Sequence, residues 1–106
     1  MKIVYTYHAR QDLRDLFDYI ALTLLSPDAA RRTAERILAA VRSLSSLPER
    51  YPLYHDEPWH SRNVRFITVK NYLVFYTADA ETVTILRILY AGRDVSKQLD
   101  DPPENA

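Results

Sequence analysis

A chain of 106 residues is long enough for one compact domain and too short for two ordinary ones, so a single hydrophobic core is expected. Its apolar fraction of 47% and charged fraction of 26% are typical of soluble globular proteins and exclude a wholly disordered or fibrous chain. A formal net charge of zero argues against general nucleic-acid binding, and the absence of cysteine excludes disulfides, thiolate nucleophiles and cysteine zinc sites.

The N-terminal part of the chain predicts a strand and a first helix. Residues 2–7, KIVYTY, are β-branched and aromatic, which favours a strand. Apolar residues then recur at helical spacing, with charged residues largely off their stripe, so an amphipathic helix follows. The stripe consists of Leu13, Leu16, Phe17, Ile20 and Leu24.

A second helix is expected to begin near Ser26. Serine can cap a helix, and the missing N–H of Pro27 costs nothing at the first helical position. Two helices joined by so short a connection predict an antiparallel hairpin. The apolar face of the second helix consists of Ala30, Ala34, Ile37, Leu38, Val41 and Leu44.

The rest of the chain predicts a loop and three strands. Residues 47–61 are rich in proline and show no sustained period, which indicates a loop, and its aromatic side chains indicate that it lies against the fold. Residues 63–69, 72–78 and 82–90 predict strands whose connections suit hairpin turns, so an antiparallel meander is expected. The single domain then ends at residue 99, and a short tail, residues 100–106, is expected to be disordered.

The last strand carries a charge in an apolar row. Strict alternation places on one face Val83, Ile85, Arg87 and Leu89. A guanidinium in such a row needs a partner, so Arg87 either forms a structural ion pair with a carboxylate of the helical hairpin or contacts a target. Gly92 is expected to permit a positive φ or a close backbone approach.

The proline-rich loop holds two histidines, His55 and His60, beside Asp56 and Glu57. A histidine–carboxylate pair can act as a general base or bind a metal, but loop histidines are usually solvated, and the third histidine, His8, is distant in sequence. We therefore expect no metal site and no cofactor.

Nothing in the sequence predicts export or membrane insertion. The N-terminal residues lack the uninterrupted apolar core of a signal peptide, and no stretch approaches the roughly 18 apolar residues that a membrane span requires. We expect a cytoplasmic protein.

The order of these elements resembles the RelE/ParE family of bacterial toxins from type II toxin–antitoxin modules. Three blocks carry the likeness, which covers roughly residues 2–99: ARQDLRDLFDYIA, SPDAARRTAERILAAVRSLSSLPERYP and NYLVFYTADAETVTILRILYAGRD. The resemblance implies an α+β fold, in which an N-terminal strand precedes an antiparallel two-helix hairpin packed on an antiparallel three- to four-stranded sheet.

Two activities follow from this resemblance. Members of the RelE branch are ribosome-dependent mRNA endonucleases, and members of the ParE branch inhibit DNA gyrase. Metal-free RNA cleavage needs a base, an acid and cations that stabilise the phosphorane. Leu73 and Leu99 stand where the RelE branch commonly has an arginine and a tyrosine, so the sequence is closer to the ParE branch. Tyr90 stands where that branch often has a histidine.

The leading hypothesis is therefore a plasmid-stabilisation toxin that inhibits gyrase by protein contact through Arg87, Tyr90 and Arg93. The alternative is a metal-independent mRNA endonuclease, with the ribosome as partner, that uses Arg65 together with the same three residues. A third is a decayed toxin that acts as a co-repressor with its antitoxin. The resemblance implies a cognate ParD-like antitoxin, and we expect no membrane partner and no sequence-specific DNA binding by this chain alone. The eight tyrosines favour an interface role.

Overall fold

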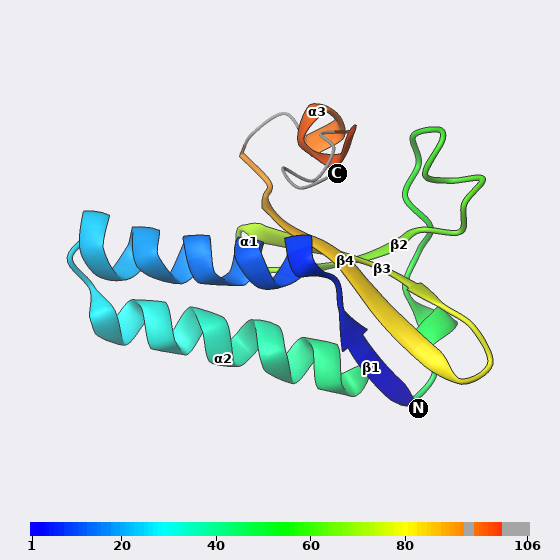
Figure 1. The fold of residues 1–106 in the computed structure, drawn as a ribbon, viewed down its shortest axis with the longest axis horizontal. Helices are drawn as coiled ribbons and strands as arrows, with labels where there is room; N and C mark the ends of the chain where they lie inside the picture. The colour runs from blue at the N-terminus through cyan, green and yellow to red at the C-terminus, as the bar shows by residue number, and fades with distance from the viewer. Residues whose placement is uncertain (93–94, 101–106) are drawn as a thin grey trace.

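The computed structural model describes residues 1–92 and 95–100, and it confirms the predicted α+β fold. A two-helix hairpin projects from a twisted sheet, and Figure 1 shows the hairpin connection at the end far from the strands. The elements are β1 Lys2–Tyr5, α1 Tyr7–Asp18, the π-helical turn η1 Tyr19–Thr23, α2 Pro27–Ser43, the 3₁₀ turn η2 Pro48–Arg50, β2 Arg65–Val69, β3 Tyr72–Ala78, β4 Thr82–Tyr90 and α3 Val95–Asp100. Within the described ranges, no helix has the length and apolar content to cross a membrane.

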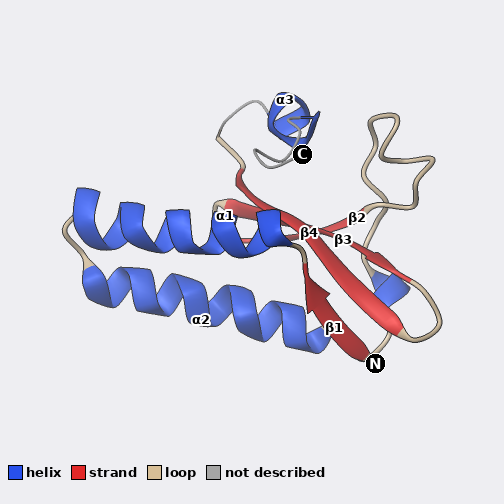
Figure 2. Ribbon diagram, viewed as in Figure 1, coloured by secondary structure: helices blue, strands red, loops and turns tan. Residues whose placement is uncertain are grey.

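The four strands lie in the order β1-β4-β3-β2, drawn in red in Figure 2. The predicted antiparallel meander of β2, β3 and β4 is confirmed. The first strand, however, pairs in parallel with β4, with Lys2 opposite Thr82 and Tyr5 opposite Ile85, so the sheet is mixed. Local turn patterns reveal hairpins but not a pairing between the two ends of a chain. β4 is a central strand, which explains its apolar residues on both faces.

Apolar clusters cover both faces of the sheet. The larger cluster joins the helical hairpin to one face and includes Ile37, Val41 and Ile85, which are almost fully buried. The smaller cluster lies on the other face, where Tyr54 of the proline-rich loop and Leu99 of α3 pack together with Phe75. The prediction that the loop lies against the fold is confirmed.

A β-bulge in β4 overturns the predicted alternation of that strand. Phe75 pairs with Arg87 whereas its neighbour Tyr76 pairs with Ile85, which leaves Leu86 as the extra residue. Neighbouring residues of a strand point to opposite faces and paired residues share a face, so Arg87 and Ile85 lie on opposite faces. The prediction that they share a row was wrong, because strict alternation assumes a strand without a bulge.

The first helix begins earlier than its apolar stripe indicated. The Thr6 side chain caps α1 by accepting a hydrogen bond from the Ala9 N–H at 3.0 Å, so the first strand ends at Tyr5. Two residues of the predicted stripe are surface residues, since Phe17 is 37% exposed and Leu24 is 55% exposed. A π-helical turn holds one residue more than an α-helical turn, and this turn shifts Leu24 off the buried face.

The second helix begins as predicted, with Ser26 at the N-cap and Pro27 at the first helical position. The Ser26 side chain makes no capping hydrogen bond, so the start depends on the proline and on Asp28 in the first turn. Ala30 is fully buried, which lets α2 approach the rest of the core closely.

Candidate functional site

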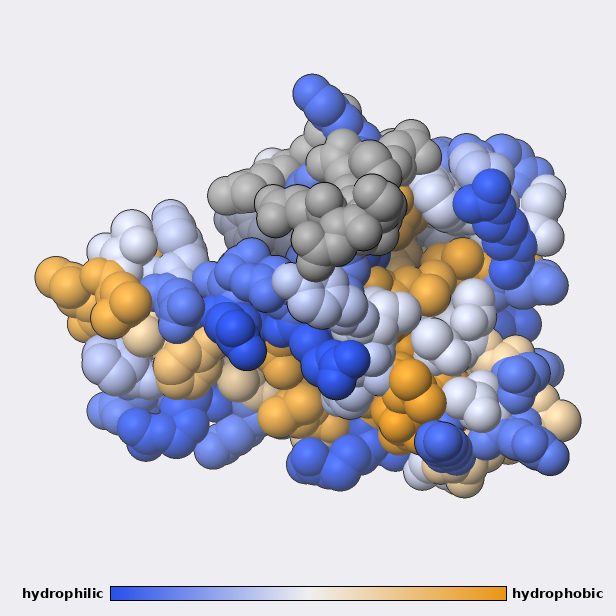
Figure 3. Space-filling model, in the orientation of Figure 1, coloured by the Kyte–Doolittle hydropathy of each residue, from blue (hydrophilic) through white to orange (hydrophobic). Residues whose placement is uncertain are grey.

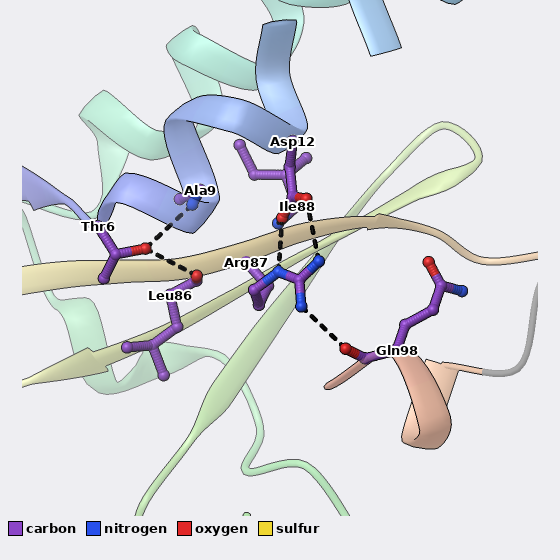
Figure 4. Close-up of polar contacts among 7 residues, drawn as sticks. All are labelled: Thr6, Ala9, Asp12, Leu86, Arg87, Ile88 and Gln98. Atoms are coloured by element: carbon purple, nitrogen blue, oxygen red, sulfur yellow. Dashed lines mark hydrogen bonds and ion pairs between the residues drawn. The ribbon is translucent and has the colours of Figure 1, made fainter. Parts of the chain in front are cut away.

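All three nitrogens of the Arg87 guanidinium donate hydrogen bonds within the chain. Its Nε and Nη2 atoms donate to the two carboxylate oxygens of Asp12 at 2.8 and 3.0 Å, and its Nη1 donates to the Gln98 carbonyl of α3 at 2.8 Å (Figure 4). The side chains of Arg87 and Asp12 are only 14% and 12% exposed. Arg87 therefore forms an ion pair with a carboxylate of the helical hairpin, which is one of the two roles that the sequence left open.

The same carboxylate also completes the sheet edge. β1 ends opposite Ile85, so the remainder of β4 has no strand on that side. The N-cap residue Thr6 and the N-terminal half of α1 take the place of the missing strand. Thr6 donates its hydroxyl to the Leu86 carbonyl at 2.9 Å, and Asp12 accepts the Ile88 N–H at 2.9 Å (Figure 4). One carboxylate thus satisfies a buried cation and an edge amide together.

Arg65 is also occupied by contacts within the chain. Its Nη1 donates to the carbonyls of Glu49 and Tyr51 at 3.1 and 2.7 Å, which fastens the start of the proline-rich loop to β2. Arg65 pairs with Tyr76 in the sheet, and burial raises the pKa of the Tyr76 phenol to about 12. Because Arg87 pairs with Phe75 instead, the two arginines lie on opposite faces of the sheet.

Tyr90 stands at the end of β4 with its ring partly in solvent. It is 44% exposed and meets Tyr72 edge to face, with ring centroids 5.7 Å apart. The Tyr90 ring lies so close to Gly92 that a Cβ there would come within 2.4 Å of the Tyr90 Cε2 atom. Gly92 has no positive φ, so of its two expected roles the structure shows the close approach. Arg93 lies outside the described residues.

The predicted polar residues do not converge on one point. Tyr90 lies on the same face as Arg65, because their partners in β3, Tyr72 and Tyr76, share that face. The stretch of β3 between these two partners nevertheless spans about 13 Å. Arg87 lies on the other face. Of the four residues of the endonuclease alternative, the three that the structure describes are separated.

A groove with a volume of about 650 Å³ lies beside Tyr90, between α1 with its π-helical turn and the ends of β3 and β4. Its apolar surface comes from Leu16, Tyr19, Ile20, Leu24, Tyr72, Ile88, Leu89 and Tyr90. Its polar residues carry both signs, with Asp12 and Asp15 on the helix and Lys70 at the turn between β2 and β3. Such a groove suits an apolar segment with polar flanks.

Comparisons with known proteins now identify the family. Residues 3–95 match the family model described as ParE toxin of type II toxin-antitoxin system, parDE. The chain belongs to this family. Its fold is similar to a solved structure of the chromosomal ParDE TA system from P. aeruginosa, with a TM-score of 0.70 over 85% of this chain and 95% of that one. The two are 22% identical, so this likeness supports the fold alone. No match is found among curated proteins.

Two of the three histidines of this ParE-type toxin, His55 and His60, lie on the surface of the proline-rich loop, whereas His8 lies in α1. His55 contacts Asp56 at 3.4 Å, between Nε2 and Oδ1, with its side chain 74% exposed. Glu57 accepts hydrogen bonds from the backbone and hydroxyl of Ser61, which lower the pKa of its carboxyl. Over residues 1–92 and 95–100, no cluster of three or more histidine, cysteine, aspartate or glutamate residues could hold a metal ion.

Sequence reasoning missed two features of the toxin. Asp12 was one of several charges off the apolar stripe, and nothing in its neighbourhood marked it as the partner of Arg87. The second feature is a set of exposed apolar residues where α1 meets α2, including Leu22 and Leu25, which are 70% and 80% exposed. The only signal available for them was that leucines occur on both sides of the expected helix, too many for one buried face.

Proposed function

We propose that this ParE-type toxin arrests growth by binding DNA gyrase through protein–protein contact, and that a cognate antitoxin neutralises it. The family identifies a toxin of a type II toxin–antitoxin system, which implies an antitoxin partner. The gyrase target follows from the resemblance of the sequence to the ParE branch. The toxin then contributes a binding surface and no bond-making step.

One observation carries the preference for docking over RNA cleavage. A phosphorane must be stabilised by several groups that point at one phosphate, and these groups must be free to do so. Arg65 and Arg87 instead point to opposite faces of the sheet, and each donates to groups of its own chain. Moving Arg87 to a substrate would leave the largely buried Asp12 carboxylate unpaired, and moving Arg65 would release the loop carbonyls that it binds, which supports a structural role for both.

The groove is the surface that we propose for the antitoxin. Its apolar lining suits the apolar stripe of a segment that folds on binding, and Asp15 and Lys70 offer charges of opposite sign to residues beside that stripe. Tyr90 supplies a large, partly exposed aromatic surface at one end of the groove. Target contact by Tyr90 and Arg93 stays a prediction.

The function is tested with purified toxin in a DNA supercoiling reaction. We expect the toxin to inhibit supercoiling by gyrase in proportion to its concentration, and the antitoxin encoded beside it to restore activity. The competing activity is measured by primer extension on ribosome-bound message. New 5′ ends on that message, together with normal supercoiling, would contradict the proposal.

The antitoxin surface is tested by comparing two tyrosines. Tyr90 lines the groove, whereas Tyr7 is 56% exposed and does not line it. We expect Tyr90→Ala to weaken antitoxin binding at least about tenfold, as is usual for an aromatic anchor, and Tyr7→Ala to change it less than about twofold. Titration calorimetry gives both affinities. Equal affinities for the two variants would place the antitoxin elsewhere.

A further inference from the structure

Exposed apolar side chains gather at the connection between the two long helices. Tyr19, Leu22, Leu24 and Leu25 are between 50% and 80% exposed, and we call these four residues the hairpin tip. The space-filling view shows an orange cluster at the left end of the molecule, where the hairpin connection lies (Figure 3). A contiguous apolar surface of this kind is typical of a contact site.

The backbone of the hairpin tip is ordered by hydrogen bonds rather than frayed. The Leu24 N–H donates to the Tyr19 carbonyl, and the Ser26 N–H donates to the Ile20 carbonyl, both at 3.0 Å. These bonds close the π-helical turn and the end of the helix, although they leave Leu25 with a φ of 54°. The helix end thus holds the leucines outward in a fixed arrangement, and π-helical turns often occur at functional sites.

A single exposed leucine is not evidence of a contact site. Leu47, four residues beyond the C-terminal end of α2, has a φ of 53° and is 73% exposed, much like Leu25. Leu47 has no exposed apolar neighbour in the chain, since Ser45, Ser46, Pro48 and Glu49 flank it. Clustering therefore distinguishes the hairpin tip, and Leu47 provides its matched control.

The charges around the hairpin tip indicate the chemistry of its partner. Near the tip α1 carries Arg14, Asp15 and Asp18, and α2 carries Asp28, Arg31 and Arg32, so acids and bases are balanced. Nucleic acids and anionic lipids require a local excess of cations, which this rim lacks. An apolar centre with a rim of both signs is instead complementary to a protein surface of the same composition.

The shape of the hairpin tip indicates a concave partner. The hairpin projects from the sheet (Figure 1), and the molecule is longest along one axis, with extents of 40 × 28 × 24 Å. A stable flat interface needs about 800 Å² and roughly 20–30 residues from each partner, far more than the four residues of the tip provide. A projecting tip buries its whole surface only when it enters a cleft, so two copies that meet tip to tip would bury little of it.

We infer that the hairpin tip is the contact that the toxin inserts into an apolar cleft of its target protein. This inference rests on the proposed function, under which the target is gyrase. Tyr19 and Leu24 belong both to the hairpin tip and to the lining of the groove. An antitoxin bound in the groove then covers part of the tip, so antitoxin and target compete and neutralisation needs no change of fold.

The test compares the double variant Leu22→Asp, Leu25→Asp with Leu47→Asp. Aspartate tolerates a positive φ better than leucine, so neither change should strain the backbone. We expect the tip variant to need at least about tenfold more toxin for half-inhibition of gyrase supercoiling, and the control variant to stay within about twofold of the unaltered toxin. Circular dichroism and thermal melting show that each variant is folded, and induced expression in cells measures growth arrest.

The outcomes separate the inference from the proposed function. If the unaltered toxin inhibits supercoiling and the tip variant inhibits it equally well, the role of the hairpin tip is overturned. The gyrase proposal then stands. If the unaltered toxin arrests growth without inhibiting gyrase, the gyrase proposal fails, and growth arrest by the tip variant decides the inference: loss supports it and retention overturns it. If sedimentation shows that the unaltered toxin is a dimer and the tip variant is a monomer, the tip contacts a second copy of the chain. That result would overturn the inference.

Discussion

The two ends of α1 contrast in how their side chains are used. In its N-terminal half, Asp12 holds a buried arginine and an edge amide of the sheet, so the carboxylate, the guanidinium and the amide all have partners. Beyond its other end, Leu22 and Leu25 extend into solvent. Charged residues that look like a site are thus used for folding, and apolar residues that look like core are free to bind.

The contrast shows where folding alone fails to explain the structure. Burying a charge is costly unless it is paired, and the pairing of Arg87 with Asp12 accounts for both residues without invoking a ligand. Exposed leucines on an ordered turn contribute little to the core, and one of them has a positive φ. Departures from local rules of this kind are expected at functional surfaces.

The largest effect on this contrast is expected from removal of the Asp12 carboxylate in the N-terminal half of α1. Asp12→Ala leaves the Arg87 guanidinium buried without its counter-ion and the Ile88 N–H without its acceptor. We expect a loss of about 3–5 kcal/mol in the free energy of unfolding, which is typical for breaking one side of a buried ion pair. Urea unfolding followed by circular dichroism measures the change.

Two further variants make that measurement specific. Asp15→Ala, on the same helix, removes a carboxylate that is exposed and accepts a hydrogen bond from Gln11, so a change below about 0.5 kcal/mol is expected. Asp12→Asn keeps an acceptor for the Ile88 N–H and should lie between the two alanine variants. Equal stabilities of the two alanine variants would show that the Arg87 ion pair does not hold this edge together.

Most of the fold could be predicted from the sequence because its signals are local. Strands β3 and β4 occupy the predicted residues 72–78 and 82–90, since alternation and short turns define a hairpin without reference to the rest of the chain. The parallel pairing of β1 and the bulge at Leu86 have no local signal. Both depend on how distant segments fit together, which the apolar pattern of one strand does not encode.

The candidate site was harder to predict because its charged residues are buried and its apolar residues are exposed, the reverse of the usual distribution. The sequence showed that Arg87 needs a partner, but several acidic residues of the first helix were equally suitable. Leu24 continues the helical spacing from Ile20, which predicts a core residue, whereas the π-helical turn places its side chain at the surface. The groove joins α1 to the ends of two strands, so it follows from the tertiary structure only.

The same contrast can be tested at a single side chain. Leu25 and Leu47 have φ values of 54° and 53°, a conformation that asparagine adopts more readily than leucine. Leu25→Asn and Leu47→Asn should each raise the free energy of unfolding by roughly 1 kcal/mol, because both relieve the same backbone strain. Thermal melting measures the gain for each variant.

The two substitutions should differ in toxicity although they agree in stability. Leu25→Asn removes an apolar group from the hairpin tip, so growth arrest on induced expression should weaken even as the protein becomes more stable. Leu47→Asn changes an isolated leucine and should leave growth arrest unaltered. Equal toxicity of the two stabilised variants would mean that Leu25, like Leu47, is exposed only because helix ends place some apolar residues in solvent.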